Sequence, residues 1–353
     1  MSKAEKKVEM EYLSPMQAHA AMEPLCATAS VTPEGCEIWA PTQSSDFATM
    51  MAMGVTKLPP EKIKIQTTYL GGGFGRKIEY DFLLAPLVAS KALGKPVKIT
   101  WTREEDTRND FFRPPFMINM QFGLDSSGLP DGLKVKLVGP AVSRRWQMPP
   151  PWLEENGYDW VVTIGMFDGY NLPNQKPDLS KSYSIPNLKV DFVPSDIKVP
   201  TGAWRSIGTS HNIFALESGL DEVAVTGGND PFELRGKLLS HNSRAIEVLD
   251  RAAELSGWGN PSEGRFLGMA YTDYLETYQV QVAEISVSQR GTVIVHKVTC
   301  VADCGQVFNP HIARQQLEGG IIFGLTAALK GEINVQNGQI VQSNFDDYPM
   351  LKL

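Results

Sequence analysis

The chain has 353 residues, of which 42% are hydrophobic and 21% are charged, and its formal net charge is −7. This length is enough to bury a large core, either as two domains or as one domain with two lobes. The acidic balance gives no clustered positive field, so we expect neither nucleic acid nor an anionic membrane as a partner.

Signals for export and cross-linking are also missing from the pattern. No stretch approaches the roughly 18 apolar residues that a membrane-spanning helix needs, and Met1 to Lys7 lacks the apolar core of a secretion signal. A cytoplasmic location is therefore the default expectation, and a periplasmic one stays open if a signal lies on a missing segment. Four cysteines are too few for a disulfide framework. Cys300 and Cys304 are predicted to be packed core residues rather than metal ligands.

The first third of the chain alternates strand and helix patterns. Residues 1–14 are predicted to be an N-terminal tail, and the lysine cluster Lys3 to Lys7 within it is expected to be solvated, because glutamate interrupts it. Ser44 is a typical N-cap for the first helix, and Gly94 closes the second. Alternation in period two marks the strands. Predicted strands are Glu37–Ala40, Lys62–Tyr69, Val97–Thr102, Phe116–Leu124 and Leu133–Val138, and predicted helices are Ser44–Gly54 and Ile78–Leu93.

Residues 140–202 are different in composition. They are rich in proline and aromatic residues and include Pro149-Pro150-Pro151. We expect an irregular excursion with little regular structure, which lines a cleft or contacts a partner, since long loops of this kind are often functional.

Helical and hairpin patterns return after residue 202. Asn229-Asp230 caps one helix, and the turns at Gln289–Gly291 and Asn337-Gly338 each join two strands. Predicted helices are His211–Val225, Pro231–Leu239, Ser243–Ser256 and Ile312–Leu329, and predicted strands are Gln279–Ser288 and Thr292–Val301. The whole pattern predicts an α+β fold, with mixed sheets and packed helices.

The segment Gly71-Gly72-Gly73-Phe74-Gly75-Arg76 lies between a predicted strand and a predicted helix. Consecutive glycines let the backbone reach positive φ and approach a ligand closely. Several N–H groups can then converge on one anion, helped by the helix N-terminus that follows. Arg76 is expected to add a fixed positive charge, and Phe74 an apolar wall. The segment is therefore predicted to be a cradle for an anionic cofactor, and a tight turn without a ligand is the alternative.

Two common nucleotide motifs do not match this glycine-rich segment. Its spacing is not that of the P-loop, G-x-x-x-x-G-K-[ST]. It also fails G-x-G-x-x-G, and no acidic residue ends a strand about 20 residues later. A nucleotide-binding protein is therefore the less favoured interpretation of this loop.

Other segments occur in an order that resembles a known family. They include His19–Pro24, Pro41-Thr42-Gln43, Gly202–Gly208, Phe214–Glu222, Asp303–Pro310 and Gln315–Gly319. Together with the glycine loop they resemble the large subunit of the molybdenum hydroxylases, which include xanthine dehydrogenase and aldehyde oxidase. The form of the first segment and of the loop is most similar to the isoquinoline 1-oxidoreductase beta-subunit type. The resemblance runs from Tyr12 to Tyr348.

The resemblance implies a fold, a cofactor and partners. The fold is a two-lobed molybdopterin-binding domain, with a first lobe at 15–240 and a second at 241–353 that is incomplete at its C-terminus. The cofactor is molybdenum held by molybdopterin or its cytosine dinucleotide form. The implied reaction hydroxylates an N-heterocycle or oxidises an aldehyde with oxygen derived from water. Electrons leave through iron–sulfur clusters on a partner subunit, while the protein supplies orientation and electrostatics.

The resemblance also assigns site residues by position. Gln43 matches a glutamine that hydrogen-bonds a molybdenum oxo ligand, and glutamine can donate such a bond without adding charge. Arg205 matches an arginine beneath the metal, although a buried ion pair is the alternative. Gln316 matches a glutamine that binds the pterin, although it could instead cap its helix. The predicted cofactor-binding set is Gln43, Gly73, Phe74, Gly75, Arg76, Arg205, Gln316, Asn344 and Phe345. The last two fall near a backbone segment that holds the cofactor phosphate.

The catalytic residue is left unassigned. In the family a glutamate near the end of the subunit acts as general base, and that segment would follow Leu353. Neither Glu332 nor Glu79 matches its position. A Gly-Gln-Gly segment at the front is also missing, so we expect a central fragment that is incomplete for catalysis alone. The alternative is a non-catalytic binding or assembly module that keeps the fold without a cofactor.

Overall fold

The computed structural model describes residues 4–142, 159–165 and 183–351. Two compact units divide the chain, and each combines three segments that are separate in sequence. The first unit contains residues 1–14, 116–195 and 208–322, and the second contains 15–115, 196–207 and 323–353. Each unit thus takes residues from both of the lobes expected from the sequence, and the boundary between residues 240 and 241 stays a prediction.

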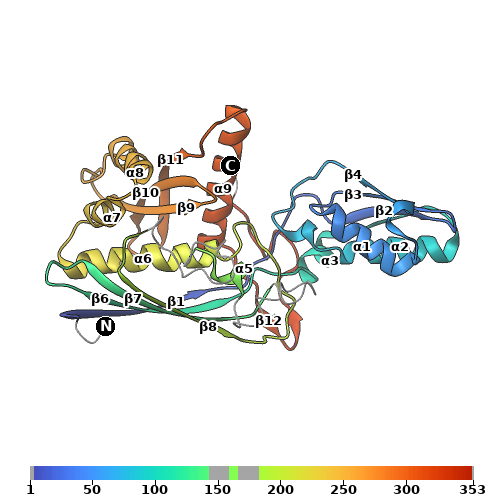
Figure 1. Ribbon diagram of the computed structural model, residues 1–353, viewed down its shortest axis with the longest axis horizontal. Coiled ribbons are helices and arrows are strands. Elements are labelled where there is room, and N and C mark those ends of the chain that lie inside the picture. Colours follow the sequence, from blue (N-terminus) through green and yellow to red (C-terminus); the bar gives the residue numbers. More distant parts are fainter. Residues whose placement is uncertain (1–3, 143–158, 166–182, 352–353) are drawn as a thin grey trace. The chain divides into compact units, whose positions relative to one another are not determined.

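One sheet of the first unit has the strand order β1-β6-β7-β8 (Figure 1). Its strands are β1 (Lys6–Ser14), β6 (Phe116–Leu124), β7 (Pro130–Gly139) and β8 (Asn187–Pro194). The pairs β1-β6 and β6-β7 are antiparallel, whereas β7 and β8 are parallel. The short helix α5 (Trp160–Thr163) lies between β7 and β8 in the sequence.

The prediction of a tail was wrong for Lys6–Ser14, because β1 pairs with β6 along its whole length. Val8, Met10 and Tyr12 are partly buried, whereas Glu9 and Glu11 between them are exposed. The charged residues therefore form the solvent face of a strand, and period-two alternation was the signal for it. The prediction that residues 140–202 have little regular structure was also wrong in part, since β8 lies within that range. Residues 143–158 and 166–182 of that excursion lie outside the described residues.

A second sheet of the first unit has the order β11-β10-β9 and is covered by helices. It contains β9 (Phe266–Tyr274), β10 (Thr277–Val287) and β11 (Val293–Asp303), and the helices are α6 (Thr209–Gly227), α7 (Pro231–Leu239) and α8 (Ser243–Ser256). Helix α8 packs on β10 and β11, and α6 contacts strands of both sheets. Buried Arg235 joins α7 to α6 through Glu217 at 2.9 Å and Asp221 at 2.7 Å. The division between the units falls within α9 (Pro310–Leu329).

The second unit is built on a sheet of order β4-β3-β2-β5 (Figure 1). Its strands are β2 (Cys26–Val31), β3 (Cys36–Ala40), β4 (Ile63–Thr67) and β5 (Val97–Thr100), and its helices are α1 (Ser45–Thr56), α2 (Asp81–Leu93) and α3 (Arg103–Arg108), with two short 3-10 turns, η1 (Pro60–Lys62) and η2 (Arg76–Ile78). A small hairpin pairs β12 (Val335–Gln336) with β13 (Gln339–Ile340). The predicted caps are confirmed: Ser44 accepts from the amide of Phe47, and Gly94 is left-handed.

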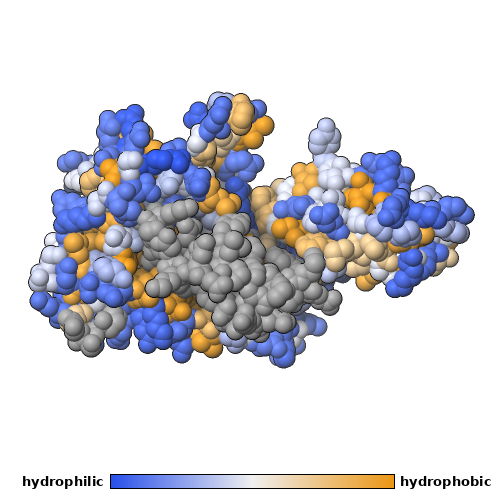
Figure 2. All heavy atoms as spheres, viewed as in Figure 1, coloured by the Kyte–Doolittle hydropathy of each residue, from blue (hydrophilic) through white to orange (hydrophobic). Residues whose placement is uncertain are grey.

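The core of the second unit lies where α1 and α2 pack against the sheet. Its buried members are small or branched residues of the strands, such as Ala29 and Ile38, and larger residues of α2, such as Phe82 and Leu87. Small strand residues let the two helices come close to the sheet. Some hydrophobic residues of both helices remain exposed, including Met50 and Leu84, and Figure 2 shows hydrophobic surface among hydrophilic residues over α1 and α2. The α+β class with mixed sheets is confirmed.

Candidate functional site

The glycine loop, residues 71–76, joins β4 to the 3-10 turn η2 in the second unit. Three of its glycines are needed for close approach by three different segments. A β-carbon on Gly71 would collide with the side chain of Glu23, and one on Gly73 with that of Gln43. A β-carbon on Gly75 would collide with the backbone carbonyl of Ala203. The loop is therefore the meeting point of the segments at 19–24, 41–43 and 202–208.

Three consecutive amides of this loop have no hydrogen-bond acceptor among the described residues. The amide of Gly71 donates to Glu23 at 2.8 Å, and that of Gly75 donates to Gln43 at 3.1 Å. Between them, the N–H groups of residues 72–74 have no acceptor within the part of the chain that the structure describes. Buried or half-buried amides normally find a partner. Neighbouring free N–H groups therefore fit a bound anion.

Gln43 uses one end of its side chain to support the loop. Its Oε1 accepts from the amides of Gly75 at 3.1 Å and Lys77 at 3.3 Å. These bonds orient the amide, and the residue is otherwise exposed. The Nε2 group donates to no described residue, so it is available to an acceptor on a ligand. This is the donor that the predicted role of Gln43 requires.

Strained backbone gathers on the same segments. Phe74 has φ of 55°, and Ser206 and Ile207 in the facing segment have φ of 70° and 45°. A bulky or β-branched residue at positive φ is uncommon. Such conformations cost about 1 to 3 kcal/mol each and occur most often at functional sites. The strain is thus consistent with two loops held in shape for a ligand.

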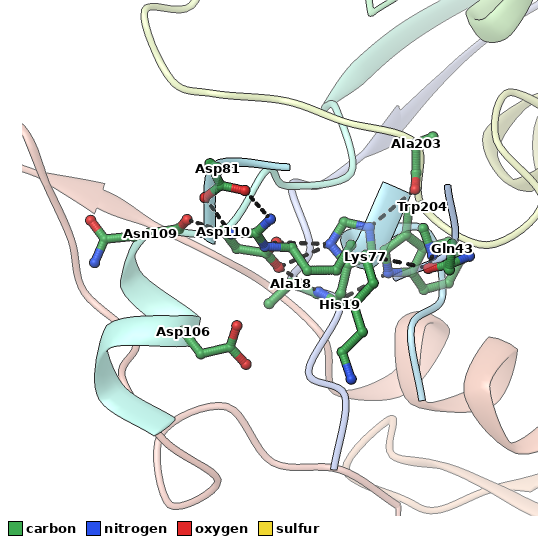
Figure 3. A network of polar contacts seen from close by, with 12 residues as sticks. Ala18, His19, Gln43, Lys77, Asp81, Asp106, Asn109, Asp110, Ala203 and Trp204 are labelled. Atoms are coloured by element: carbon green, nitrogen blue, oxygen red, sulfur yellow. Dashed lines mark hydrogen bonds and ion pairs between the residues drawn. The ribbon is translucent and has the colours of Figure 1, made fainter. Parts of the chain in front are cut away.

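Arg76 has a different position from the one expected. Its guanidinium is 1% exposed and donates to both carboxylate oxygens of Asp81 at 2.8 Å. Its Nε also lies 3.1 Å from Asp110 (Figure 3). Burial by itself would lower the pKa of Arg76, but Asp81 and Asp110 raise it, so the cation is retained. The charge is committed to internal carboxylates, and the geometry favours a supporting role under the loop. Its inclusion in the cofactor site stays a prediction.

Asp110 connects Arg76 to His19. Its Oδ2 accepts from the backbone amide of His19 at 2.7 Å, and its Oδ1 lies 2.9 Å from Nδ1 of the same residue. Burial would raise the pKa of Asp110, but the charges and hydrogen bonds of His19 and Arg76 lower it overall. For nearby Asp106, burial and the charge of Asp110 raise the pKa to about 6, although Arg103 opposes them. Two neighbouring carboxyls thus titrate in different ranges.

A second ion pair, between Lys77 and Glu23, supports the start of the loop at Gly71. Lys77 is fully buried, and its Nζ is 2.5 Å from Oε2 of Glu23. The same oxygen accepts from the amide of Gly71. Partial burial would raise the pKa of Glu23, but the bonds from Lys77 and Gly71 lower it. Glu23 therefore links Gly71, at the start of the loop, to Lys77, just after its end.

The tip of the loop belongs to an aromatic stack. Phe323 lies between Phe74, with ring centroids 4.6 Å apart, and Trp204, with centroids 4.5 Å apart. The guanidinium carbon of Arg113 lies 5.3 Å from the Trp204 ring centroid. Offset stacking of this kind adds about 0.5 to 1.5 kcal/mol per pair beyond the buried area. Phe74 is therefore held in place by the rings beside it, and its role as a wall of the cofactor site stays a prediction.

The remaining predicted residues lie in three places. Arg205 is half-buried next to Trp204, and burial lowers its pKa. Asn344 donates to Glu104 on α3 at 2.7 Å, and the ring of Phe345 lies beneath Arg103 at 4.9 Å. Gln316 is exposed on the part of α9 that belongs to the first unit. The structure therefore brings Gln43, the glycine loop and the segment of Arg205 together, and the membership of the others stays a prediction.

Sequence reasoning missed several residues that shape this site. Lys77 follows Arg76 directly, just before a predicted helix. Two adjacent basic residues at that position could have indicated an internal ion pair. Trp204 lies inside the segment Gly202–Gly208, and Phe323 lies in the apolar part of the last long helix. Asp110 had no local signal, because it lies 91 residues from His19 in the sequence.

Among residues 4–142, 159–165 and 183–351, no three His, Cys, Asp or Glu side chains lie close enough together to hold a metal ion. Within the same ranges, none of the helices is both long and apolar enough to cross a membrane.

The sequence is similar to known domain families and to subunits of characterised oxidoreductases. Residues 1–141 match the model of a molybdopterin cofactor-binding domain, and residues 256–353 match a second model with the same description. The chain is 30% identical to the beta subunit of isoquinoline 1-oxidoreductase from Brevundimonas diminuta, covering 97% of this chain and 43% of that protein. It is 24% identical to one of the subunits of nicotinate dehydrogenase from Pseudomonas putida, covering 99% of this chain and 30% of that one. The chain thus spans less than half the length of these curated relatives.

Solved structures share the fold. Quinoline 2-oxidoreductase from Pseudomonas putida 86 superposes with a TM-score of 0.82 at 14% identity, covering 99% of this chain and 68% of that one. The Cu,Mo-CO dehydrogenase superposes with a TM-score of 0.80 at 13% identity, again over 99% of this chain and 68% of the other.

Proposed function

Because this chain belongs to the molybdenum hydroxylase family, we propose that it forms the molybdopterin-binding part of an oxidoreductase. The proposed enzyme hydroxylates an N-heterocycle or oxidises an aldehyde with oxygen derived from water. The relatives named as isoquinoline 1-oxidoreductase and nicotinate dehydrogenase subunits support the heterocycle class. The relative named as the molybdenum-binding subunit of an Escherichia coli aldehyde oxidoreductase, 26% identical over 85% of this chain, supports the aldehyde class.

The observation that carries this proposal is the run of open amides at residues 72–74 beside the free Nε2 of Gln43. Together these donors can hold anionic and oxo groups without a charged side chain at the loop tip. Arg205 is half-buried in the segment whose Ala203 carbonyl meets Gly75, and it can add a forked cationic donor. The residues present therefore fit a molybdopterin cofactor or its cytosine dinucleotide form.

The cofactor, when bound, supplies the redox chemistry of the reaction. The chain supplies the shape. The Phe74-Phe323-Trp204 stack excludes water from one side of the loop, and Gln43 orients a donor toward the ligand. We further propose an iron–sulfur subunit as the partner that accepts electrons, in keeping with relatives whose names describe them as subunits.

Metal and pterin analysis of the chain purified together with its partners tests the proposal. We expect about one molybdenum and one pterin per chain. Arg205→Ala should lower the molybdenum content, whereas Arg314→Ala, at an exposed i,i+4 ion pair on α9, should leave it unchanged. Complete absence of molybdenum and pterin from the complex would favour the alternative, a non-catalytic binding or assembly module. Equal molybdenum in both variants would remove Arg205 from the site.

A further inference from the structure

His19 makes hydrogen bonds from both of its ring nitrogens while it is only 1% exposed. Its Nδ1 lies 2.9 and 3.0 Å from the two carboxylate oxygens of Asp110, and its Nε2 lies 3.1 Å from the backbone carbonyl of Ala203. Both partners are acceptors. Only the doubly protonated imidazolium can donate to both.

The carbonyl of Ala203 is the group that lies against Gly75, where a β-carbon would not fit. The next residue adds a second link, since Trp204 Nε1 donates to the carbonyl of Ala18 at 3.2 Å. Residues 18 and 19 therefore hold residues 203 and 204 by one bond each (Figure 3). Arg205 follows directly in the sequence.

We propose that His19 is a positioning residue that clamps residues 203–205 against the glycine loop. Its Asp110 bond fixes the ring orientation, and its Ala203 bond fixes the distance between the two segments. The consequence for cofactor binding rests on the proposed function, because Arg205 and the open amides would face one ligand only when these segments are held together. The clamp itself is a property of the chain without a cofactor.

Hydrogen exchange measured by mass spectrometry on the cofactor-free full chain tests the clamp. Two variants separate the two bonds. In His19→Asn the amide nitrogen takes the place of Nδ1, so it can keep the bond to Asp110 but cannot reach Ala203. In His19→Gln the amide nitrogen takes the place of Nε2 and can still donate to Ala203.

We expect exchange in residues 201–207 to be about tenfold faster in His19→Asn than in the wild type, the factor for loss of one buried hydrogen bond. His19→Gln should restore much of the protection. His311→Asn, at an exposed histidine of α9, should match the wild type. Strands β10 and β11 of the other unit serve as the internal reference. Wild-type exchange at 201–207 in His19→Asn would overturn the proposal, and so would equal acceleration in the Asn and Gln variants.

Asp110→Asn provides a second test if His19→Asn does not fold. The amide oxygen still accepts from Nδ1, but a neutral amide is a weaker acceptor than a carboxylate. Exchange at 201–207 should increase, and no change would count against the clamp. In the complex with its partners, His19→Asn should lose more molybdenum than His19→Gln. If the wild-type complex holds no molybdenum, the proposed function fails while the exchange result still decides the clamp.

Discussion

The backbone carbonyl of Ala203 occupies the space that a β-carbon on Gly75 would need. The two residues are far apart in sequence, and only glycine allows their backbones to meet. Gly75 also has φ of 108°, which disfavours any other residue. This contact holds the loop at 71–76 to the segment that carries Arg205, so it is the most direct target for disrupting the site.

Gly75→Ala should therefore destabilise the second unit by more than about 3 kcal/mol, since a backbone clash adds to the strain of positive φ. Gly94→Ala is the matched control, because Gly94 also has positive φ but has no atom within 4 Å of an added β-carbon. It should cost about 1 to 2 kcal/mol. Urea unfolding with domain-resolved hydrogen exchange measures both. Similar losses in the two variants would show that conformation alone, and not the Ala203 contact, requires glycine at 75.

Gln43→Ala should free the amides of Gly75 and Lys77 and remove the Nε2 donor at once. We expect molybdenum retention in the partner complex to fall about tenfold, since the loss of one or two hydrogen bonds near a charged ligand is worth roughly 1.5 to 3 kcal/mol. Gln66→Ala removes a glutamine of β4 that bonds Glu37 in the same unit, and it should retain the metal normally. Molybdenum contents that do not differ between the two would contradict the role of Gln43.

Glu23→Gln should leave the buried ammonium of Lys77 without its carboxylate. Removing one member of a buried pair costs up to about 3 to 5 kcal/mol, and the partial exposure of Glu23 should reduce this to roughly 2 to 3 kcal/mol. The double variant Glu23→Gln/Lys77→Met should recover part of the loss, because it removes the unpaired charge as well. A double-mutant cycle by urea unfolding tests this coupling. Additive losses would mean that the pair contributes no coupling energy.

Asp106→Asn should change how stability depends on pH. The folded-state pKa of Asp106 is raised to about 6 from an ordinary value of 3.8, so the folded state binds its proton more tightly than the unfolded state. The free energy of unfolding of the wild type therefore falls as pH rises from about 4 to 6. Asparagine cannot ionise, and this loss should be absent from the variant.

The advantage of Asp106→Asn over the wild type should accordingly grow by up to about 3 kcal/mol between pH 4 and 6 and then level off, since one pKa unit corresponds to about 1.4 kcal/mol. Unfolding free energies measured at half-unit steps of pH give the comparison. Asp131→Asn, at an exposed aspartate of the other unit, provides the baseline. A constant difference across this range would show that Asp106 does not titrate there.

Much of the secondary structure could be predicted from the sequence, because local chemistry encodes it. The helix at Pro231–Leu239 was placed correctly at both ends from its Asp230 cap, and α2 was closed correctly by Gly94. The strand at Lys6–Ser14 was missed because charged residues on its solvent face resemble a tail. Strand β8 was missed because the proline-rich composition around it obscured its alternation.

The sequence by itself determined the prediction that Gln43, the glycine loop and the segment of Arg205 share one site, since the order and type of residues carry that information. Only the tertiary structure decided what each side chain does there. Arg76 was expected to present a charge to an anion, and instead it pairs with Asp81 and Asp110 beneath the loop. His19 had no assigned contact beyond its own segment, and its ring reaches the carbonyl of Ala203, 184 residues away in the sequence. Local periodicity sets which face of an element is buried, but the partners of a buried charge are set by packing between distant segments.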